Sequence, residues 1–407
     1  MFCEDTVERV SIWGNRDFRL VWTSGAVSGV GSWLLVVAIP FHVFQLTGSA
    51  AATGLTLALE ALPALLLGPW AGVLLDRWDL ARAMWVADLV SAAAVAVILF
   101  ADRPERLWMI YLAVLVENIA TTVFRPASRA LLPSVVGTGP ELAAANAARA
   151  FAGSVTRLGA PPLGALLLAG PGITFVLAVD IASYLLSAAT IAAIRTRPAR
   201  APHQPLRPLA GLQYAVRSKP LRGLLAGNGV FLIANAGLTA LLVPLMVERL
   251  DAPGYTVGYV FSGLGAGYLL GAAISVRALS WLGIRDLIAA TQLATGAAFF
   301  ALVNAPNVPW AIAAAVLIGL PGSVLLITTE TTVQRITTPG MLAQVGALFF
   351  AVDALAAVVG ALAAPAITVV ADLPVTLNLL AASAVLAAPL TLYAVPGHPA
   401  ELTRKPS

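Results

Sequence analysis

Long apolar runs separated by short polar breaks fill the chain from about residue 18 to residue 395. A helix needs about 20 mostly apolar residues to cross the roughly 30 Å hydrocarbon core of a bilayer. The runs predict twelve transmembrane helices, at residues 18–46, 50–75, 83–101, 107–130, 140–169, 172–194, 219–247, 254–280, 285–304, 308–334, 340–370 and 374–395. The predicted fold class is therefore an all-α membrane protein, in which the helix bundle is itself the core.

Composition supports this interpretation and restricts the class of partner. Of the 407 residues, 59% are hydrophobic and 11% are charged, whereas a soluble domain carries about 25% charge. The net charge is +4, but the arginines are distributed among short loops, so we expect no nucleic-acid partner. Only Arg103, Arg106 and Arg249 lie in loops opposite the termini. By the positive-inside rule both termini are then cytoplasmic. The composition, rich in Ala and Arg, suggests a bacterial protein, so we expect a multi-pass protein of the bacterial cytoplasmic membrane.

The twelve spans divide into two halves. We predict a leader at 1–17, a six-helix bundle at 18–194, a proline-rich cytoplasmic linker at 195–218, a second six-helix bundle at 219–395 and a tail at 396–407. A shift of 204 residues aligns the halves and matches five pairs of helix-bending, close-packing or apolar residues: Gly25 with Gly229, Pro40 with Pro244, Leu46 with Leu250, Gly54 with Gly258, and Pro161 with Pro365. The matches favour a parallel internal repeat and two pseudo-symmetric bundles.

Ionisable residues inside the predicted spans are functional candidates, because a charge at the bilayer centre costs roughly 2.5–3.5 kcal/mol on insertion scales. Glu117 is the closest to mid-span and has no obvious local partner, so it is the first candidate for a proton-carrying carboxylate. Asp353 ranks second and Glu60 third. Arg157 and Asp180 occupy similar depths on consecutive spans and are expected to form either a structural ion pair or part of the pathway. His42, near the outer end of the first span, is either a pathway residue or a packed one.

Two polar clusters near the predicted cytoplasmic side suggest gating. Glu330 lies close to Arg335, where a gate ion pair is the preferred interpretation. The loop after the second span contains Gly72, Asp76, Arg77 and Arg82. This loop is either an ordinary turn with topology-setting charges or a state-dependent lock, in which Asp76 approaches the positive end of a helix dipole near Met341 to Gly346 in an outward-open state.

The loop also resembles the signature of the major facilitator superfamily, which has the form Gly-x3-Asp-Arg followed by a basic cluster, although only Arg82 remains of that cluster. Three other segments resemble the branch that includes the enterobactin exporter and macrolide efflux proteins: Asn15 to Trp22, Leu46 to Ala50, and Phe124 to Pro133. Gly159, Pro161 and Gly164 are similar to the antiporter motif of proton-coupled exporters, with Ala160 and Ala165 in place of two of its glycines. Ordinary helix packing also explains these small residues.

This resemblance implies a monomeric transporter that works by alternating access, most simply proton-coupled efflux of a small amphipathic compound such as an antibiotic, a siderophore or another natural product. The alternatives are a lysophospholipid or other lipid transporter, and a non-transporting membrane scaffold or sensor. Phosphate-binding-loop, nucleophile-elbow and HExxH motifs are missing from the sequence, so we expect neither an enzyme nor nucleotide-driven transport. Three scattered histidines and one cysteine predict no metal site. The expected partners are the substrate, protons and membrane lipids, with a proton gradient in place of a cofactor.

Overall fold

The computed structural model describes residues 12–75, 78–137, 140–196, 210–338 and 341–395. Within these ranges the structure is helical and contains no strand. The first half contains α1 (Arg16–Thr47), α2 (Ala50–Leu75), α3 (Leu80–Ile98), α4 (Leu107–Val136), α5 (Pro140–Ala169) and α6 (Ile173–Ala192). The second half contains α7 (Ala210–Arg217), α8 (Lys219–Ala240), α9 (Leu242–Pro244), α10 (Val257–Trp281), α11 (Ile284–Val303), α12 (Val308–Ile336), α13 (Leu342–Ile367), α14 (Leu373–Val385) and α15 (Ala387–Ala394).

The all-helical membrane fold is confirmed. Eleven helical segments of the described chain are long and apolar enough to cross a membrane. The twelfth predicted span is α5, a 30-residue helix whose polar residues lower its hydropathy and which packs against both α1 and α10. Because α5 lies between α1 of the first bundle and α10 of the second, its position agrees with the predicted count of twelve spans.

Three predicted segments differ from the structure in their local helix pattern. The run 219–247 is not one helix, because α8 ends at Ala240 and is followed by α9 and a π-helical turn, Leu245–Arg249. Apolar side chains continue through this break, so hydropathy does not reveal it. The run 374–395 divides at Leu386 into α14 and α15. Finally, α7 forms within the range predicted as a linker.

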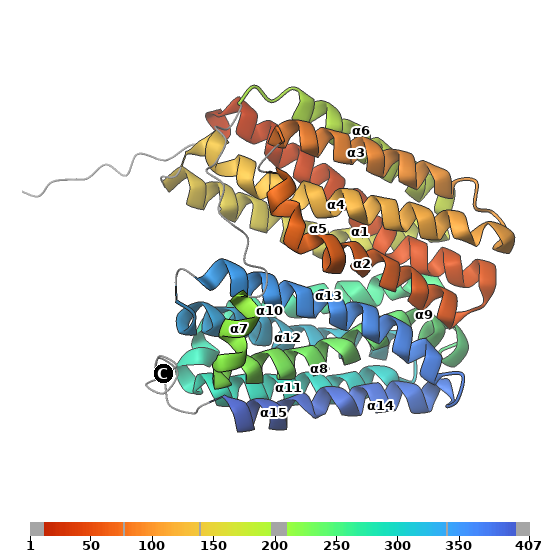
Figure 1. Ribbon diagram of the computed structural model, residues 1–407. Helices are drawn as coiled ribbons and strands as arrows, with labels where there is room; N and C mark the ends of the chain where they lie inside the picture. The colour runs from red at the N-terminus through yellow and green to blue at the C-terminus, as the bar shows by residue number, and fades with distance from the viewer. Residues whose placement is uncertain (1–11, 76–77, 138–139, 197–209, 339–340, 396–407) are drawn as a thin grey trace, which may run out of the picture.

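The helices form two bundles, α1–α6 and α7–α15, which lie one above the other in Figure 1. In the first bundle α1 packs against α5 and α6, and α3 packs against α4 and α6. In the second, α12 packs against α10 and α11, and α8 packs against α13. Contacts between the bundles are made chiefly by α2 with α13 and by α5 with α10.

The internal repeat explains how the bundles join. Gly54 on α2 lies directly against the Ala361 carbonyl and the Pro365 ring on α13. Gly258 on α10 lies in the same way against the Pro161 carbonyl on α5. These two glycines and two prolines are two of the pairs matched by the 204-residue shift, so each glycine packs on the proline-bearing helix of the opposite half. Such contacts need glycine, because a side chain would hold the two helix backbones apart.

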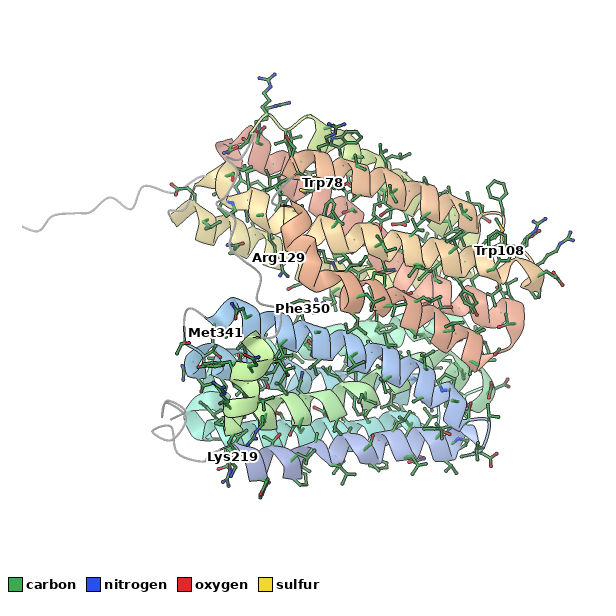
Figure 2. All side chains as sticks on the ribbon, viewed as in Figure 1. Trp78, Trp108, Arg129, Lys219, Met341 and Phe350 are labelled. Atoms are coloured by element: carbon green, nitrogen blue, oxygen red, sulfur yellow. The ribbon has the colours of Figure 1, made fainter. Side chains whose placement is uncertain are left out.

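Both contacts lie toward the end of the molecule that carries the α1–α2 turn, and the bundles diverge toward the other end (Figure 1). There, large apolar side chains of the same inter-bundle helices are uncovered. Phe151 on α5 is 71% exposed and Phe350 on α13 is 62% exposed, and Figure 2 shows Phe350 on the side of its bundle that faces the other bundle. The bundles are therefore in close contact at the end that carries the α1–α2 turn and diverge toward the end where α1 begins (Figure 1).

Short polar contacts determine where the first helices begin. Asn15 caps α1 by accepting a hydrogen bond from the Phe18 amide (3.1 Å), and its own side-chain amide donates to the Val135 carbonyl (2.8 Å). Asp17 accepts from the Thr196 amide (2.8 Å) and hydroxyl (2.7 Å), and so joins the start of α1 to the segment after α6. These contacts give structural roles to two residues of the segment Asn15 to Trp22.

Candidate functional site

A polar cavity lies inside the first bundle, between α1, α2, α3 and α4. Its volume is about 160 Å³. Apolar side chains from α1 and α3 form part of its wall, and Glu60 on α2 and Glu117 on α4 line it together with Arg125. The cavity therefore brings together two of the three ranked carboxylates.

Glu117 is at the centre of a hydrogen-bond network. One carboxylate oxygen accepts from the Tyr184 hydroxyl (2.6 Å) and from Thr121 (3.2 Å), and the other accepts from the Asn118 side-chain amide (2.7 Å). The expectation that Glu117 has no local partner was wrong. Tyr184 lies 67 positions further along the chain, and its contact depends on how α4 and α6 are rotated against each other.

The network extends across the bundle. The Tyr184 hydroxyl also lies 3.1 Å from the Ser32 hydroxyl on α1, and Ser32 is itself part of the cavity wall. Hydroxyl groups donate and accept hydrogen bonds, so the Glu117–Tyr184–Ser32 chain connects a carboxylate to a second helix through exchangeable protons. In chemical terms the site has the components of a proton-binding relay, and its described residues include no nucleophile–base pair.

Asp180 and Arg157 do not form the predicted ion pair. Asp180 is fully buried, and one of its oxygens lies 3.4 Å from the Ser183 hydroxyl while the other has no hydrogen-bond partner among the described residues. Gly31 on α1 leaves the space that Asp180 occupies, since a Cβ there would overlap the carboxylate. Arg157 is exposed instead, with its guanidinium 5.4 Å from the centre of the Trp33 ring. Similar depth on neighbouring helices did not determine which way each side chain points.

Asp88 is a buried carboxylate that was not among the predicted site residues. It is 2% exposed and accepts a hydrogen bond of 2.5 Å from Ser187 on α6, which lies 2.7 Å from Ser24 on α1. Asp88 falls inside the predicted span 83–101, so the rule that selected Glu117 also identifies it. The Asp88–Ser187–Ser24 chain holds α3, α6 and α1 together.

Other candidates lie apart from this cavity. Asp353 is on α13 in the second bundle and accepts a hydrogen bond from Asn228 on α8 (3.1 Å). Glu330 and Arg335 are both described and both exposed on α12, and they do not form the predicted ion pair. His42 is buried with Nε2 3.2 Å from the Ala101 carbonyl. It is a packed residue outside the cavity wall.

The antiporter-like segment of α5 lies within the described residues. In α5, Pro161 packs against Gly258, and Gly164 lies close to the backbone of Leu34 on α1, whereas a Cβ on Gly159 would meet no atom within 4 Å. This segment is therefore a packing element between α1 and α10.

In the loop motif, Gly72 lies near the end of α2, and the Arg82 amide donates to Asp79, which caps α3 (2.9 Å). Asp76 and Arg77 lie outside the described residues, so the Asp76 lock stays a prediction.

Comparison with known proteins identifies the relatives of this architecture. A family model described as "Transmembrane secretion effector" matches residues 11–403. Macrolide efflux protein A of Streptococcus pyogenes is 30% identical over 182 residues, which cover 44% of each chain. The enterobactin exporter EntS of Shigella dysenteriae is 27% identical over 271 residues, or 63% of this chain and 62% of the relative. These alignments span less than two thirds of either relative's length.

Solved structures show the same fold at low sequence identity. The nucleoside transporter NupG superposes with a TM-score of 0.76 at 12% identity, covering 93% of this chain and 98% of the other. A bacterial homologue of the human lysosomal transporter Spinster, in an inward-facing and unoccupied conformation, gives a TM-score of 0.75 at 13% identity, covering 98% and 100%. Both are transporters, and the likeness concerns the arrangement of helices.

Proposed function

The chain belongs to the transmembrane secretion effector family of major facilitator transporters, and from this premise we propose that it exports a small amphipathic compound in exchange for protons. The substrate class is that of an antibiotic, a siderophore or another natural product, in keeping with the names of the efflux relatives. Alternating access of the two bundles provides the mechanism.

The observation that carries this proposal is the Glu117–Tyr184 hydrogen bond of 2.6 Å beside a cavity that also holds Glu60. A carboxylate in a low-dielectric site favours its neutral, protonated form, and hydrogen bonds that donate to it favour the charged form. Glu117 lies inside the bundle, which favours its protonated form, and accepts a hydrogen bond from Tyr184, which favours its charged form. Breaking or forming the Tyr184 contact as helices move therefore provides a means of binding the proton in one state and releasing it in the other.

In the proposed cycle the structure represents the state open toward the termini. If both termini are cytoplasmic, substrate enters this state from the cytoplasm. Reorientation then separates the Gly54 and Gly258 contacts and opens the opposite end, where substrate leaves and Glu117 takes up a proton. The protonated carrier returns, and loss of the proton to the cytoplasm completes the exchange.

Proton-driven efflux in inside-out vesicles tests the role of Glu117. In Glu117→Gln, which keeps the size of the side chain and removes its charge, we expect proton-driven movement of substrate to be lost while substrate binding persists. Glu105→Gln is the matched control, because Glu105 is exposed in the turn between α3 and α4. Equal activity of Glu117→Gln and the parent chain would remove Glu117 from the mechanism. Absence of transport by the parent under any proton gradient would support the scaffold or sensor alternative.

We also propose that the protein is a monomer in the bacterial cytoplasmic membrane with both termini in the cytoplasm. The single cysteine, Cys3, offers a direct test. A membrane-impermeant maleimide should label it only after cells are permeabilised. Labelling in intact cells would reverse the orientation, and with it the direction proposed for the cycle.

A further inference from the structure

A second cavity of about 160 Å³ lies between α1 and α5. Trp22 and Trp33 line it from α1, and three glycines widen it: Gly25, Gly29 and Gly153. A Cβ on Gly25 or Gly153 would meet no atom within 4 Å, so nothing occupies the space above these two glycines. The Trp22 indole is held in place by a hydrogen bond from Nε1 to the Ala148 carbonyl (3.1 Å). The result is an open slot with an aromatic side chain toward each end of its α1 wall.

The described charges at this slot are all positive. Arg149 is part of its wall, and no Asp or Glu is among the described lining residues. Arg149 donates to the Ser128 hydroxyl (3.2 Å) and lies within 3.5 Å of the Ser128 carbonyl, which leaves part of its five-donor guanidinium unused. Arg157 directly follows the lining residue Thr156 on α5. Its guanidinium lies over Trp33, 5.4 Å from the ring centre, and forms no ion pair with a described residue.

Arginines in the membrane-spanning part of a helix are costly, and they usually face a cavity or a ligand pathway. We propose that this slot binds a planar aromatic anion, with its ring beside Trp22 or Trp33 and its carboxylate or phenolate held by Arg149 and Arg157. Guanidinium groups suit this task because their fork of N–H donors matches a carboxylate and their plane stacks on aromatic rings. The proposal rests on the proposed export function and specifies the chemistry of its substrate.

The position of α1 separates this slot from the acidic cavity. The cavity that contains Glu60 and Glu117 is lined from α1 by Ser32, Leu35, Val36 and Ile39. The slot is lined from α1 by a different set that includes Trp22, Gly25, Gly29 and Trp33. An anion in the slot therefore does not meet the two carboxylates directly. The proton site and the substrate site are distinct, and they share one helix.

Equilibrium binding to the purified full-length protein in a neutral detergent tests the proposal without any proton gradient. The probes are naphthoate, neutral naphthalenemethanol of similar shape, and cyclohexanecarboxylate, which has the charge without the planar ring. We expect naphthoate to bind more tightly than either control. Arg157→Gln and Arg149→Gln should each weaken naphthoate binding by about tenfold or more, the loss expected when one charged hydrogen-bond partner is removed, and should leave naphthalenemethanol unaffected.

Arg19→Gln is the matched control, because Arg19 is an exposed arginine on α1 that does not line the slot. If Arg157→Gln does not remain monodisperse, Arg157→Lys replaces it and should retain the preference for naphthoate over naphthalenemethanol, while Arg149→Gln loses it. Equal binding of naphthoate and naphthalenemethanol, no binding of naphthoate, or unchanged binding in both Gln variants would overturn the proposal. None of these results depends on transport, so they leave the Glu117→Gln test of proton coupling intact.

Discussion

Replacing Gly54 by alanine should push the bundle interface toward its other state. Gly54 lies on α2 at the closed end of the interface, where a Cβ would lie 2.6 Å from the Pro365 ring and closer still to the Ala361 carbonyl. Ordinary van der Waals contact begins near 3.4 Å, so α2 and α13 must separate by about 0.8 Å or more, the difference between these two distances. The methyl group has no such conflict once the bundles part at this end.

The size of the effect follows from the cost of overpacking. An extra methyl group in a closely packed site costs about 1–3 kcal/mol. Because the cost falls only on the state closed at this end, it changes the ratio of the two states by roughly 5- to 150-fold, at about 1.4 kcal/mol for each factor of ten. Gly258→Ala, at the symmetric contact with Pro161, should shift the ratio in the same direction.

Distances between spin labels on the open side measure this shift. With Cys3→Ser as background, labels at Phe151→Cys and Phe350→Cys report the separation of α5 and α13, and Gly54→Ala should move their distance distribution toward shorter values. Gly68→Ala is the control, because Gly68 is also on α2 and a Cβ there would meet nothing within 4 Å. If Gly54→Ala and Gly68→Ala give the same distribution, the glycine contacts do not hold the end closed and the reasoning fails.

Three further substitutions test individual contacts. Tyr184→Phe removes the hydroxyl that donates to Glu117 and should slow proton-driven efflux several-fold without weakening substrate binding, as measured by transport and equilibrium binding on the same preparation. Asp17→Ala removes the acceptor for Thr196 and should lower the free energy of unfolding by about 1–3 kcal/mol, as measured by thermal unfolding against an exposed control, Asp102→Ala; equal melting of the two variants would contradict it. Gly31→Ala places a methyl group on the Asp180 carboxylate and should destabilise the protein by about 1–3 kcal/mol, and Asp180→Ala in the same chain should restore part of the loss.

The fold was predictable from the sequence because its main determinants are one-dimensional. Runs of apolar residues mark helices. The 204-residue shift also matches Gly54 with Gly258 and Pro161 with Pro365, and these are residues that lie at the contacts between the two bundles. The break after Ala240 was not predictable in the same way, since Leu241, Leu242 and Val243 are as apolar as the helix before them. Hydropathy reports membrane depth and says little about local backbone geometry.

The sequence selects candidate residues for the site but not their pairings. The cost of a charge inside the membrane selects Glu60 and Glu117 as candidates, and the structure places both of them at one cavity. It does not specify the rotation of each helix about its axis, which decides that Glu117 meets Tyr184 and that Arg157 faces Trp33 instead of Asp180. Asp88 was identifiable by the same rule, whereas its bond to Ser187 needed the structure.

The helix α1 connects these separate features into one mechanism. Ser32 reaches the Glu117–Tyr184 network, and other residues of the same helix, among them Trp22 and Trp33, line the slot beside Arg149. The close contact of α1 with α6 depends on Gly31, which fits directly against Asp180, so a small rotation or shift of α1 changes both cavities together. Closely packed helices rearrange between discrete positions instead of deforming continuously. We therefore propose that proton binding at the Glu117 cavity and anion binding at the slot are coupled through the position of α1.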